Sequence, residues 1–409
     1  MIKLRLAHLS LAMAALGFVA VTPVLGLSSA YAAETLRPEV GGPLQAANQM
    51  MKSGNAKGAL NELRKLENVS NKTPNENYLI ERTRAAAASS AGDYDTAARS
   101  FENLINSGKL SASESNNFSQ GLVGIYMRAR EFGKANAAIQ KQLAKGDDPT
   151  LRAYLIQNYV SMGNTKEAMS QLQREMARGN PKEDQLKMLA NLQNMTGDKT
   201  GYVATIEKLA ANYPQKSYWE DLLNRVVGKK DFSSRLNIDV LRLKMAQGLI
   251  KKPSDYMELS QLVLRDGAAA EAVRIIEKGY KEGILGVGAD APRHQRLKDL
   301  AAKTLADNNT NLAANEAALV KANDHDGLIN LGYALVQAGQ TDKGLKMMET
   351  AVKAPGLRRP QDAKLRLGEA YAQAGKKQQA IATLKTVGGT DGTADLARYW
   401  IMAINKPMA

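Results

Sequence analysis

The feature that most constrains the fold of this chain is a short segment that occurs twice. The stretch LGYALVQAG begins at Leu331, and LGEAYAQAG begins 36 residues later at Leu367. A fixed displacement of this size is typical of repeat proteins, in which each copy is one structural unit that buries its apolar face against its neighbours. The apolar residues of the segment follow a helical period. We therefore predict a chain built from stacked helical units.

The two copies resemble tetratricopeptide repeats. In that family a Leu-Gly pair in the first helix is followed by an aromatic residue, a turn glycine and a small residue in the second helix. The second copy matches closely, with Leu367, Gly368, Tyr371, Gly375 and Ala380. The first copy supplies Leu331, Gly332, Leu335, Gly339 and Gly344. The resemblance implies an all-α fold, a right-handed α-solenoid of stacked antiparallel helix hairpins.

The same turn spacing recurs upstream. A glycine is followed five residues later by an alanine at Gly54 and Ala59, Gly92 and Ala97, Gly163 and Ala168, and Gly267 and Ala272. Arg130 and Ala135 keep the spacing without the glycine. A turn glycine can adopt positive φ and end the first helix, while the small residue lets the second helix approach closely. Nine residues after each turn position we predict a core residue, namely Leu63, Phe101, Ile139, Leu172, Ile206, Ile276, Met348 and Leu384.

These patterns predict the organisation of the chain. We expect a flexible lead at residues 33–43, tetratricopeptide-like repeats at 44–227, degenerate helical repeats at 228–330, the clear repeat pair at 331–390, and a capping helix with a tail at 391–409. Within the degenerate block, residues 297–322 are predicted to form a hairpin with an Asn-rich turn. In the capping helix, Leu396, Trp400 and Ala403 are expected to shield the last hairpin. Docking of a partner on Trp400 is the alternative.

The first 32 residues have the features of a secretory signal peptide. Lys3 and Arg5 precede an apolar stretch, and small residues flank Tyr31 in the sequence Ala-Tyr-Ala that ends at Ala32. We predict cleavage after Ala32. The alternative is an uncleaved membrane anchor, which we disfavour because Thr22-Pro23 interrupts the apolar run before it reaches the roughly 20 residues that a spanning helix needs. The chain has no cysteine, which excludes disulfides, thiolate metal sites and a lipid-modified N-terminal cysteine. We therefore expect a periplasmic protein that is not a lipoprotein.

Gly339 and Gly344 are spaced like the glycines of a phosphate-binding loop. Such a loop needs a lysine and then Ser or Thr after the second glycine, because the lysine reaches the phosphates and the hydroxyl holds magnesium. Leu345 stands where the lysine belongs, and the preceding segment has a helical period instead of the pattern of a strand. We therefore interpret Gly339 as a turn residue and Gly344 as the small contact residue of a second helix.

Other cofactor motifs are incomplete. GVGADA, residues 286–291, imitates a dinucleotide fingerprint, with Asp307 about 20 residues further on as that motif requires. No strand pattern surrounds it, so we predict a loop between repeats.

Metal ligands are few. After signal cleavage, His294 and His325 are the remaining histidines. We interpret Asp324 and Asp326 as part of a capping turn for a helix that begins near Leu328, in preference to a cation site. The prediction is therefore no enzyme, no cofactor and no metal.

Charge and architecture together suggest a binding protein. Lys and Arg number 55 against 41 Asp and Glu, for a net charge of +14. We predict a protein-interaction scaffold that holds a protein or peptide partner of the cell envelope in its groove. The alternatives are a module that binds an anionic polymer or lipid surface and an envelope enzyme without a recognisable motif. Nucleic acid is not expected. The partner-binding residues and the oligomeric state remain open.

Overall fold

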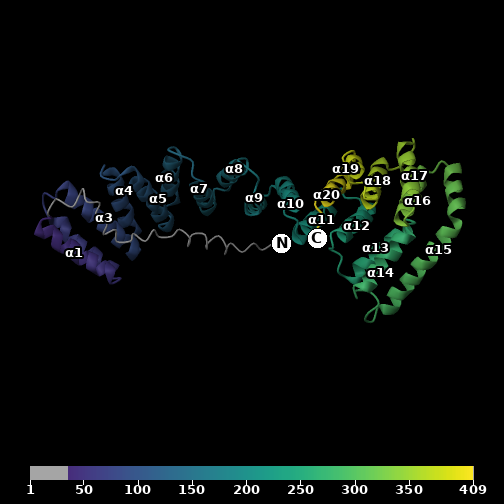
Figure 1. Ribbon diagram of the computed structural model, residues 1–409, viewed down its shortest axis with the longest axis horizontal. Helices are drawn as coiled ribbons and strands as arrows, with labels where there is room; N and C mark the ends of the chain where they lie inside the picture. The colour runs from purple at the N-terminus through teal and green to yellow at the C-terminus, as the bar shows by residue number, and fades with distance from the viewer. Residues whose placement is uncertain (1–35, 409) are drawn as a thin grey trace. The chain divides into compact units, whose positions relative to one another are not determined.

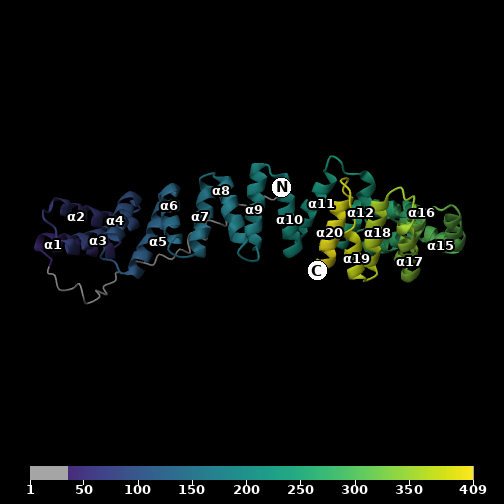
Figure 2. The same cartoon turned by 90° about the horizontal axis from the view of Figure 1, so that it is seen from above.

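The structure is a computed structural model, and it describes residues 36–408. The predicted signal peptide and its cleavage site lie outside these residues. Throughout the described part the regular elements are helices, and no strand occurs there (Figures 1 and 2). Consecutive helices pair as antiparallel hairpins, which confirms the predicted α-solenoid. The chain divides into two compact units, with the division between Gly179 and Asn180.

The N-terminal unit contains four helix hairpins. Its elements are α1 (Pro38–Lys52), α2 (Ala56–Lys65), η2 (Leu66–Asn68), α3 (Pro74–Ala91), α4 (Tyr94–Asn106), α5 (Ala112–Arg128), α6 (Phe132–Leu143), α7 (Pro149–Ser161) and α8 (Thr165–Met176). One apolar core follows the unit from Val40 to Leu155.

The C-terminal unit continues with helices of less uniform length. Its elements are α9 (Glu183–Thr196), α10 (Lys199–Asn212), α11 (Lys216–Val227), η3 (Ser234–Leu236), α12 (Asn237–Ala246), α13 (Pro253–Arg265), α14 (Ala269–Lys281), α15 (Ala291–Lys321), α16 (His325–Gln337), α17 (Thr341–Lys353), α18 (Pro360–Gln373), α19 (Lys377–Leu384) and α20 (Thr393–Asn405). Gly228, where the sequence suggested a boundary, lies inside this unit, because helices on both sides of it, α10 and α12, pack against α20.

The repeat register explains the hairpins. The turn residues Gly54, Gly92, Gly163, Gly267, Gly339 and Gly375 all have positive φ. Arg130 takes the same left-handed conformation, with φ of 62°, although it carries a side chain. The small residues five positions on, Ala59, Ala97, Ala168, Ala272 and Ala380, are completely buried. Seven of the eight predicted core positions are buried, and Phe101 is partly buried against the same core.

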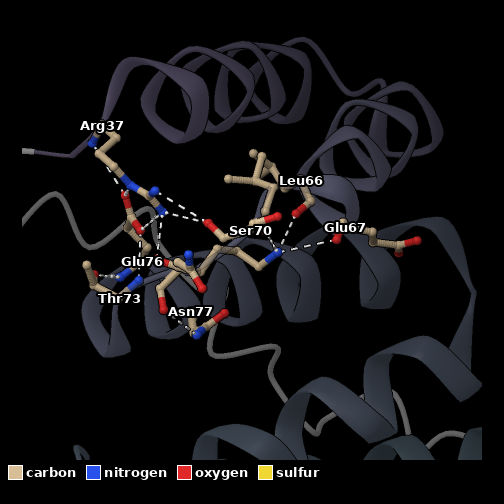
Figure 3. A network of polar contacts seen from close by, with 10 residues as sticks. Arg37, Leu66, Glu67, Ser70, Thr73, Glu76 and Asn77 are labelled. Carbon is tan, nitrogen blue, oxygen red and sulfur yellow. Dashed lines mark hydrogen bonds and ion pairs between the residues drawn. The ribbon is translucent and has the colours of Figure 1, made fainter.

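The start of α1 differs from the predicted lead. Residues 38–43, which we expected to be flexible, are helical from Pro38 onward. Arg37, the residue before the helix, points its guanidinium at the carboxylate of Glu76 (Figure 3). Its Nε and Nη2 donate to the two carboxylate oxygens at 2.9 and 2.7 Å, and Nη2 also donates to the Asn71 carbonyl at 3.1 Å. Glu76 in turn accepts from the Thr73 amide and completes the capping box of α3. These hydrogen bonds lower the pKa of Glu76 to about 2. The first helix is therefore fixed to the third.

The predicted hairpin at residues 297–322 is wrong. Residues 291–321 form the single 31-residue helix α15. No Gly or Pro lies between Lys298 and Lys321, and the polar residues of the expected turn bond inside the helix. Thr310 donates to the Ala306 carbonyl, and Asn311 donates to the Asp307 carbonyl at 2.9 Å. Their side chains therefore satisfy the helix instead of ending it.

The C-terminal helix closes its unit. Leu396, Trp400 and Ala403 are buried, and α20 packs on α18 and α19 as expected of a cap. It also packs on α10 and α12. Arg235 links η3 to α18 and to the segment before α20, because it pairs with Asp362 at 2.7 Å and with Asp391 at 2.6 Å. The helices from α10 to α20 therefore close on themselves.

Candidate binding site

The sequence-predicted glycines lie at helix contacts. A Cβ at Gly344 would lie 2.4 Å from the Gly332 carbonyl oxygen, and a Cβ at Gly332 would lie 2.6 Å from Met348 Cγ. In the next repeat, a Cβ at Gly368 would lie 2.5 Å from Leu384 Cγ. Leu367 and Tyr371 are buried in the same core, whereas Leu331 is partly buried. Gly339 lies in the turn and Gly344 in the first turns of α17, so this segment is a helix hairpin and no strand precedes it.

The motifs that resembled cofactor or metal sites are structural elements. The glycine-rich loop ends at Ala291, the first residue of α15, and Gly286 donates its amide hydrogen to Nδ1 of buried His294 at 3.1 Å. His294 and His325 stand near opposite ends of α15, which a rise of about 1.5 Å per residue makes roughly 45 Å long. Within residues 36–408 no group of three or more metal-ligating side chains occurs.

Asp324 and Asp326 have separate structural roles. Asp324 accepts a hydrogen bond from the Gly327 amide at 3.0 Å and caps α16. It is therefore the capping residue that the sequence predicted. The helix begins at His325, three residues before the expected start. Asp326 pairs with Arg358 at 2.9 Å.

A pocket that the sequence did not identify lies in the C-terminal unit. It has a volume of about 410 Å³ and is open to solvent. Its walls come from six helices: α12, α13, α14, α16, α18 and α20. The volume falls within the range of roughly 300–1,000 Å³ that is typical of ligand pockets. We take this pocket as the candidate binding site.

A row of side-chain hydrogen bonds crosses one wall of the pocket. Arg274 of α14 donates to Gln337 of α16, Gln337 donates to Gln373 of α18, and Gln373 donates to the Tyr333 hydroxyl at 3.0 Å. Gln337 and Gln373 are 36 residues apart and occupy the same position of successive repeats. The triplet Gln-Ala-Gly at the end of both first helices is the sequence signal from which this row is predictable.

The floor of the pocket is a buried ion pair. Arg242 donates to both carboxylate oxygens of Glu271, at 3.0 and 2.7 Å, and its guanidinium lies 4.4 Å from the centre of the Tyr333 ring. Behind it, Arg366 pairs with Asp266 at 2.9 Å. Bidentate Arg–carboxylate bonds fix both partners geometrically, so the floor is rigid.

Glu369 is the unpaired member of this buried group. It is fully buried, and neither carboxylate oxygen has a hydrogen-bond partner. Burial raises its pKa well above the ordinary value, and the negative charge of nearby Asp239 adds to the effect. A buried carboxylate without a hydrogen-bond partner is unfavourable, so burial favours the protonated form of Glu369. Arg242 and Arg366 pair instead with Glu271 and Asp266.

Two further polar atoms in pocket-lining residues lack partners. The indole Nε1 of Trp400, on α20, and the side-chain oxygen of Gln247, just after α12, are both buried without a hydrogen bond. Trp400 therefore covers the last hairpin, as predicted, and also forms part of the pocket wall. A buried donor and a buried acceptor without partners are unusual in native proteins.

Comparison with known proteins supports the repeat architecture. Residues 329–388, which span α16 to α19, match the family model described as tetratricopeptide repeat. A comparison with curated proteins gave no match. In the described part, no helix combines the length and apolar character needed to cross a membrane.

Solved repeat proteins are similar to this chain only at low identity. A tetratricopeptide repeat protein from Parabacteroides merdae is 11% identical, with 79% of this chain and 99% of that chain covered and a TM-score of 0.29. The P58(IPK) TPR domain is 12% identical, with 89% of this chain and 98% of that chain covered and a TM-score of 0.21. Yeast Tom70 is 13% identical over 89% and 95%, with a TM-score of 0.24. The family match therefore identifies tetratricopeptide-type repeat structure at residues 329–388, within a chain of helix hairpins.

Proposed function

We propose that this protein is a non-enzymatic scaffold of the bacterial periplasm, which holds a segment of a partner protein in the pocket of its C-terminal unit. Repeat solenoids of this type generally bind other proteins along their surfaces. The observation that carries the proposal is the pocket itself. Side chains from six helices converge there, and the polar residues among them are held by the bonds from Arg274 to Tyr333.

The arrangement of the pocket suits binding better than catalysis. Glu271 is engaged by Arg242, and Gln337 and Gln373 are engaged with each other. Catalysis by general acids and bases needs a titrating group within reach of a substrate. Glu369, a buried carboxyl without a hydrogen-bond partner, is not among the residues that line the pocket. A set of fixed amides and guanidinium groups is suited to hydrogen bonding with a polypeptide.

The periplasmic location rests on the predicted signal peptide. We propose that export removes residues 1–32 and that the chain begins at Ala33 in the mature protein. Cell fractionation followed by N-terminal sequencing tests this step separately from binding. A mature protein that still starts at Met1, or that stays in the cytoplasmic fraction, contradicts it.

Site-specific photocrosslinking in the bacterium of origin tests the scaffold function. A photoreactive amino acid is placed at Ala246 or Lys278, two exposed residues that line the pocket. The control position is Asp184 of α9, whose side chain is 97% exposed. We expect protein adducts at Ala246 and Lys278 that do not form at Asp184. No adduct at the pocket positions, or the same adducts at all three, contradicts the proposal.

A further inference from the structure

We propose that the pocket selects an apolar side chain that stands next to an acidic side chain in a linear peptide. This inference rests on the proposed scaffold function and names the chemistry of the partner segment. It is drawn from two features of the pocket, an apolar interior and a positive rim.

The interior of the pocket is mainly apolar. Leu259 and Ile275 form part of its lining, together with Met245 of α12 and Ile404 of α20. Trp400 contributes an aromatic ring from the helix that closes the unit. An aromatic ring beside aliphatic side chains is the usual environment of an anchoring residue at a protein interface. One apolar side chain of a partner therefore fits inside.

The rim carries positive charge. Arg274 and Lys278 lie one helical turn apart on α14, and both are exposed. Arg274 bonds to the neutral amide of Gln337, and no carboxylate within residues 36–408 pairs with it. The Nζ of Lys278 lies 2.9 Å from a carboxylate oxygen of Glu282, in an exposed ion pair. Since Glu271 already balances Arg242, the surplus charge at the rim favours a carboxylate there.

Charge complementarity points to a polypeptide as the occupant. A peptide can place a carboxylate beside Arg274 and Lys278 and the next apolar side chain in the interior. Gln337 and Gln373 line the same pocket, and their amides can form hydrogen bonds with a peptide group. We therefore commit to a peptide whose acidic side chain lies at the rim and whose next side chain enters the interior.

Indole resonances give a direct test, because the chain has two tryptophans. Protein with 15N-labelled indoles is titrated with an acetylated and amidated peptide that has one Glu-Leu pair in a Gly-Ser background. Trp400 should shift on binding, whereas Trp219, which is fully buried in α11, should not. Replacing the peptide Glu by Gln should weaken binding by about fivefold, the upper end for an exposed ion pair. Replacing Leu by Ser should weaken it about tenfold or more.

Protein variants locate the interaction. Arg274→Gln and Lys278→Gln should each weaken binding of the Glu-Leu peptide about threefold. Each should weaken binding of the Gln-Leu peptide less, because that peptide carries no charge for the rim to attract. Ala246→Phe, which adds a ring at an exposed lining position, should abolish the Trp400 shift. Lys281→Gln, an exposed change on the same helix outside the pocket, is the matched control and should bind as the native protein does. Circular dichroism verifies the fold of each variant.

Several results overturn this inference. Equal affinity for the Glu-Leu and Gln-Leu peptides, or no Trp400 shift with any peptide, removes the proposed selectivity. Stronger binding of a Gln-Leu peptide with a free terminal carboxylate assigns the rim to chain ends, and a Trp400 shift with phosphatidylglycerol vesicles assigns the pocket to lipid. If a partner protein is crosslinked at the pocket but the protein binds all the peptides equally, the scaffold function stands and the proposed ligand chemistry is wrong. If no partner is crosslinked, the scaffold function itself fails.

Discussion

At the scale of single residues, the contact between Gly332 and Gly344 sets how closely α16 and α17 approach. Gly344→Ala would place a Cβ 2.4 Å from the Gly332 carbonyl oxygen, a backbone atom that cannot rotate away. We expect a loss of about 1–3 kcal/mol in the free energy of unfolding, the usual cost of overpacking. Urea denaturation followed by circular dichroism measures it.

Gly124→Ala is the control for this change. Gly124 lies in α5 with ordinary helical φ, and nothing is within 4 Å of an added Cβ. Alanine should therefore stabilise the protein by about 0.5–1 kcal/mol through its higher helix propensity. If Gly344→Ala proves as harmless as Gly124→Ala, the close helix contact does not determine the packing of this hairpin.

Arg130 stands where the repeat turn usually has a glycine and keeps the left-handed backbone conformation. Its φ of 62° costs a residue with a side chain about 1 kcal/mol, and its exposed side chain has no hydrogen bond or ion pair that the replacement would remove. Arg130→Gly should therefore raise the free energy of unfolding by about 0.5–1 kcal/mol in urea denaturation. Arg130→Ala, which keeps a Cβ, should give no gain, and a gain of equal size would refute the strain argument.

At the scale of elements, the Arg37–Glu76 bonds hold α1 against α3. The pKa of Glu76 is lowered from 4.5 to about 2, so its contribution to stability is fully present above pH 4.5 and is lost as the pH falls toward 2. Arg37→Met should lower the Tm at pH 7 and flatten the decline between pH 4.5 and 2. Lys65→Met, which removes an exposed pair with Glu62, should change neither. An unchanged acid profile in Arg37→Met would contradict this account.

The contribution of Glu369 to stability should change with pH in the direction opposite to that of Glu76. Charged or titratable groups of four helices surround Glu369: Asp239 and Arg242 of α12, Glu271 of α14, Tyr333 of α16 and Arg366 of α18. Because burial raises the pKa of Glu369 above 4.5, the folded state keeps a proton that the unfolded chain releases. Its contribution is therefore fully present below pH 4.5 and declines as the pH rises toward the folded-state pKa.

Glu369→Gln should remove this decline. The amide is a neutral group of similar shape, so we expect a higher Tm at pH 8 than in the native protein and a smaller difference at pH 5. Glu258→Gln, at an exposed position of α13, should leave both values unchanged. A Tm that falls equally at both pH values would show that Glu369 is charged or otherwise bonded in the fold.

Some helices and turns could be predicted from the local sequence, and others could not. The turn at Gly339 was predictable because positive φ and a small residue five positions on are local requirements. The run from Asp307 to Asn311 looked like a turn, yet Asn costs a helix less than 1 kcal/mol, far below proline. With their side chains bonded one turn back, these residues continue α15. The sequence shows that Gln337 and Gln373 occupy the same position of successive repeats. Their hydrogen-bonded row also includes Arg274, which lies in another hairpin and could not be predicted from the repeat.

At the scale of the whole molecule, the sequence predicted the type of architecture but not the closure of the C-terminal unit. Repeat patterns report contacts between neighbours in the chain. The pocket depends on α12 and α20 lying together, and the pair between Arg235 and Asp391 spans 156 residues. No local pattern encodes such a contact. Docking of a partner on Trp400 was therefore only the alternative to its covering role, and no local pattern indicated the pocket that it lines.

Because α20 packs on α10 and α12, we expect the C-terminal unit to unfold cooperatively. Arg235 holds η3 to Asp362 of α18 and to Asp391 before α20 through partly buried ion pairs. Arg235→Met leaves both carboxylates without this partner, and we expect a loss of about 1–3 kcal/mol, less than for a fully buried pair. Arg358→Met, which removes the exposed pair with Asp326, should cost at most about 0.5 kcal/mol.

Hydrogen exchange shows where the loss acts. If the closure is cooperative, Arg235→Met should accelerate exchange in α10–α12 and in α18–α20 together, although these segments are far apart in the sequence, because α20 packs on both groups. Exchange in α3–α6, in the N-terminal unit, should stay unchanged. Acceleration confined to the residues next to Arg235 would mean that the two ends of the C-terminal unit open independently. Since α12 and α20 both line the pocket, a joint opening would also weaken the Trp400 response to peptide.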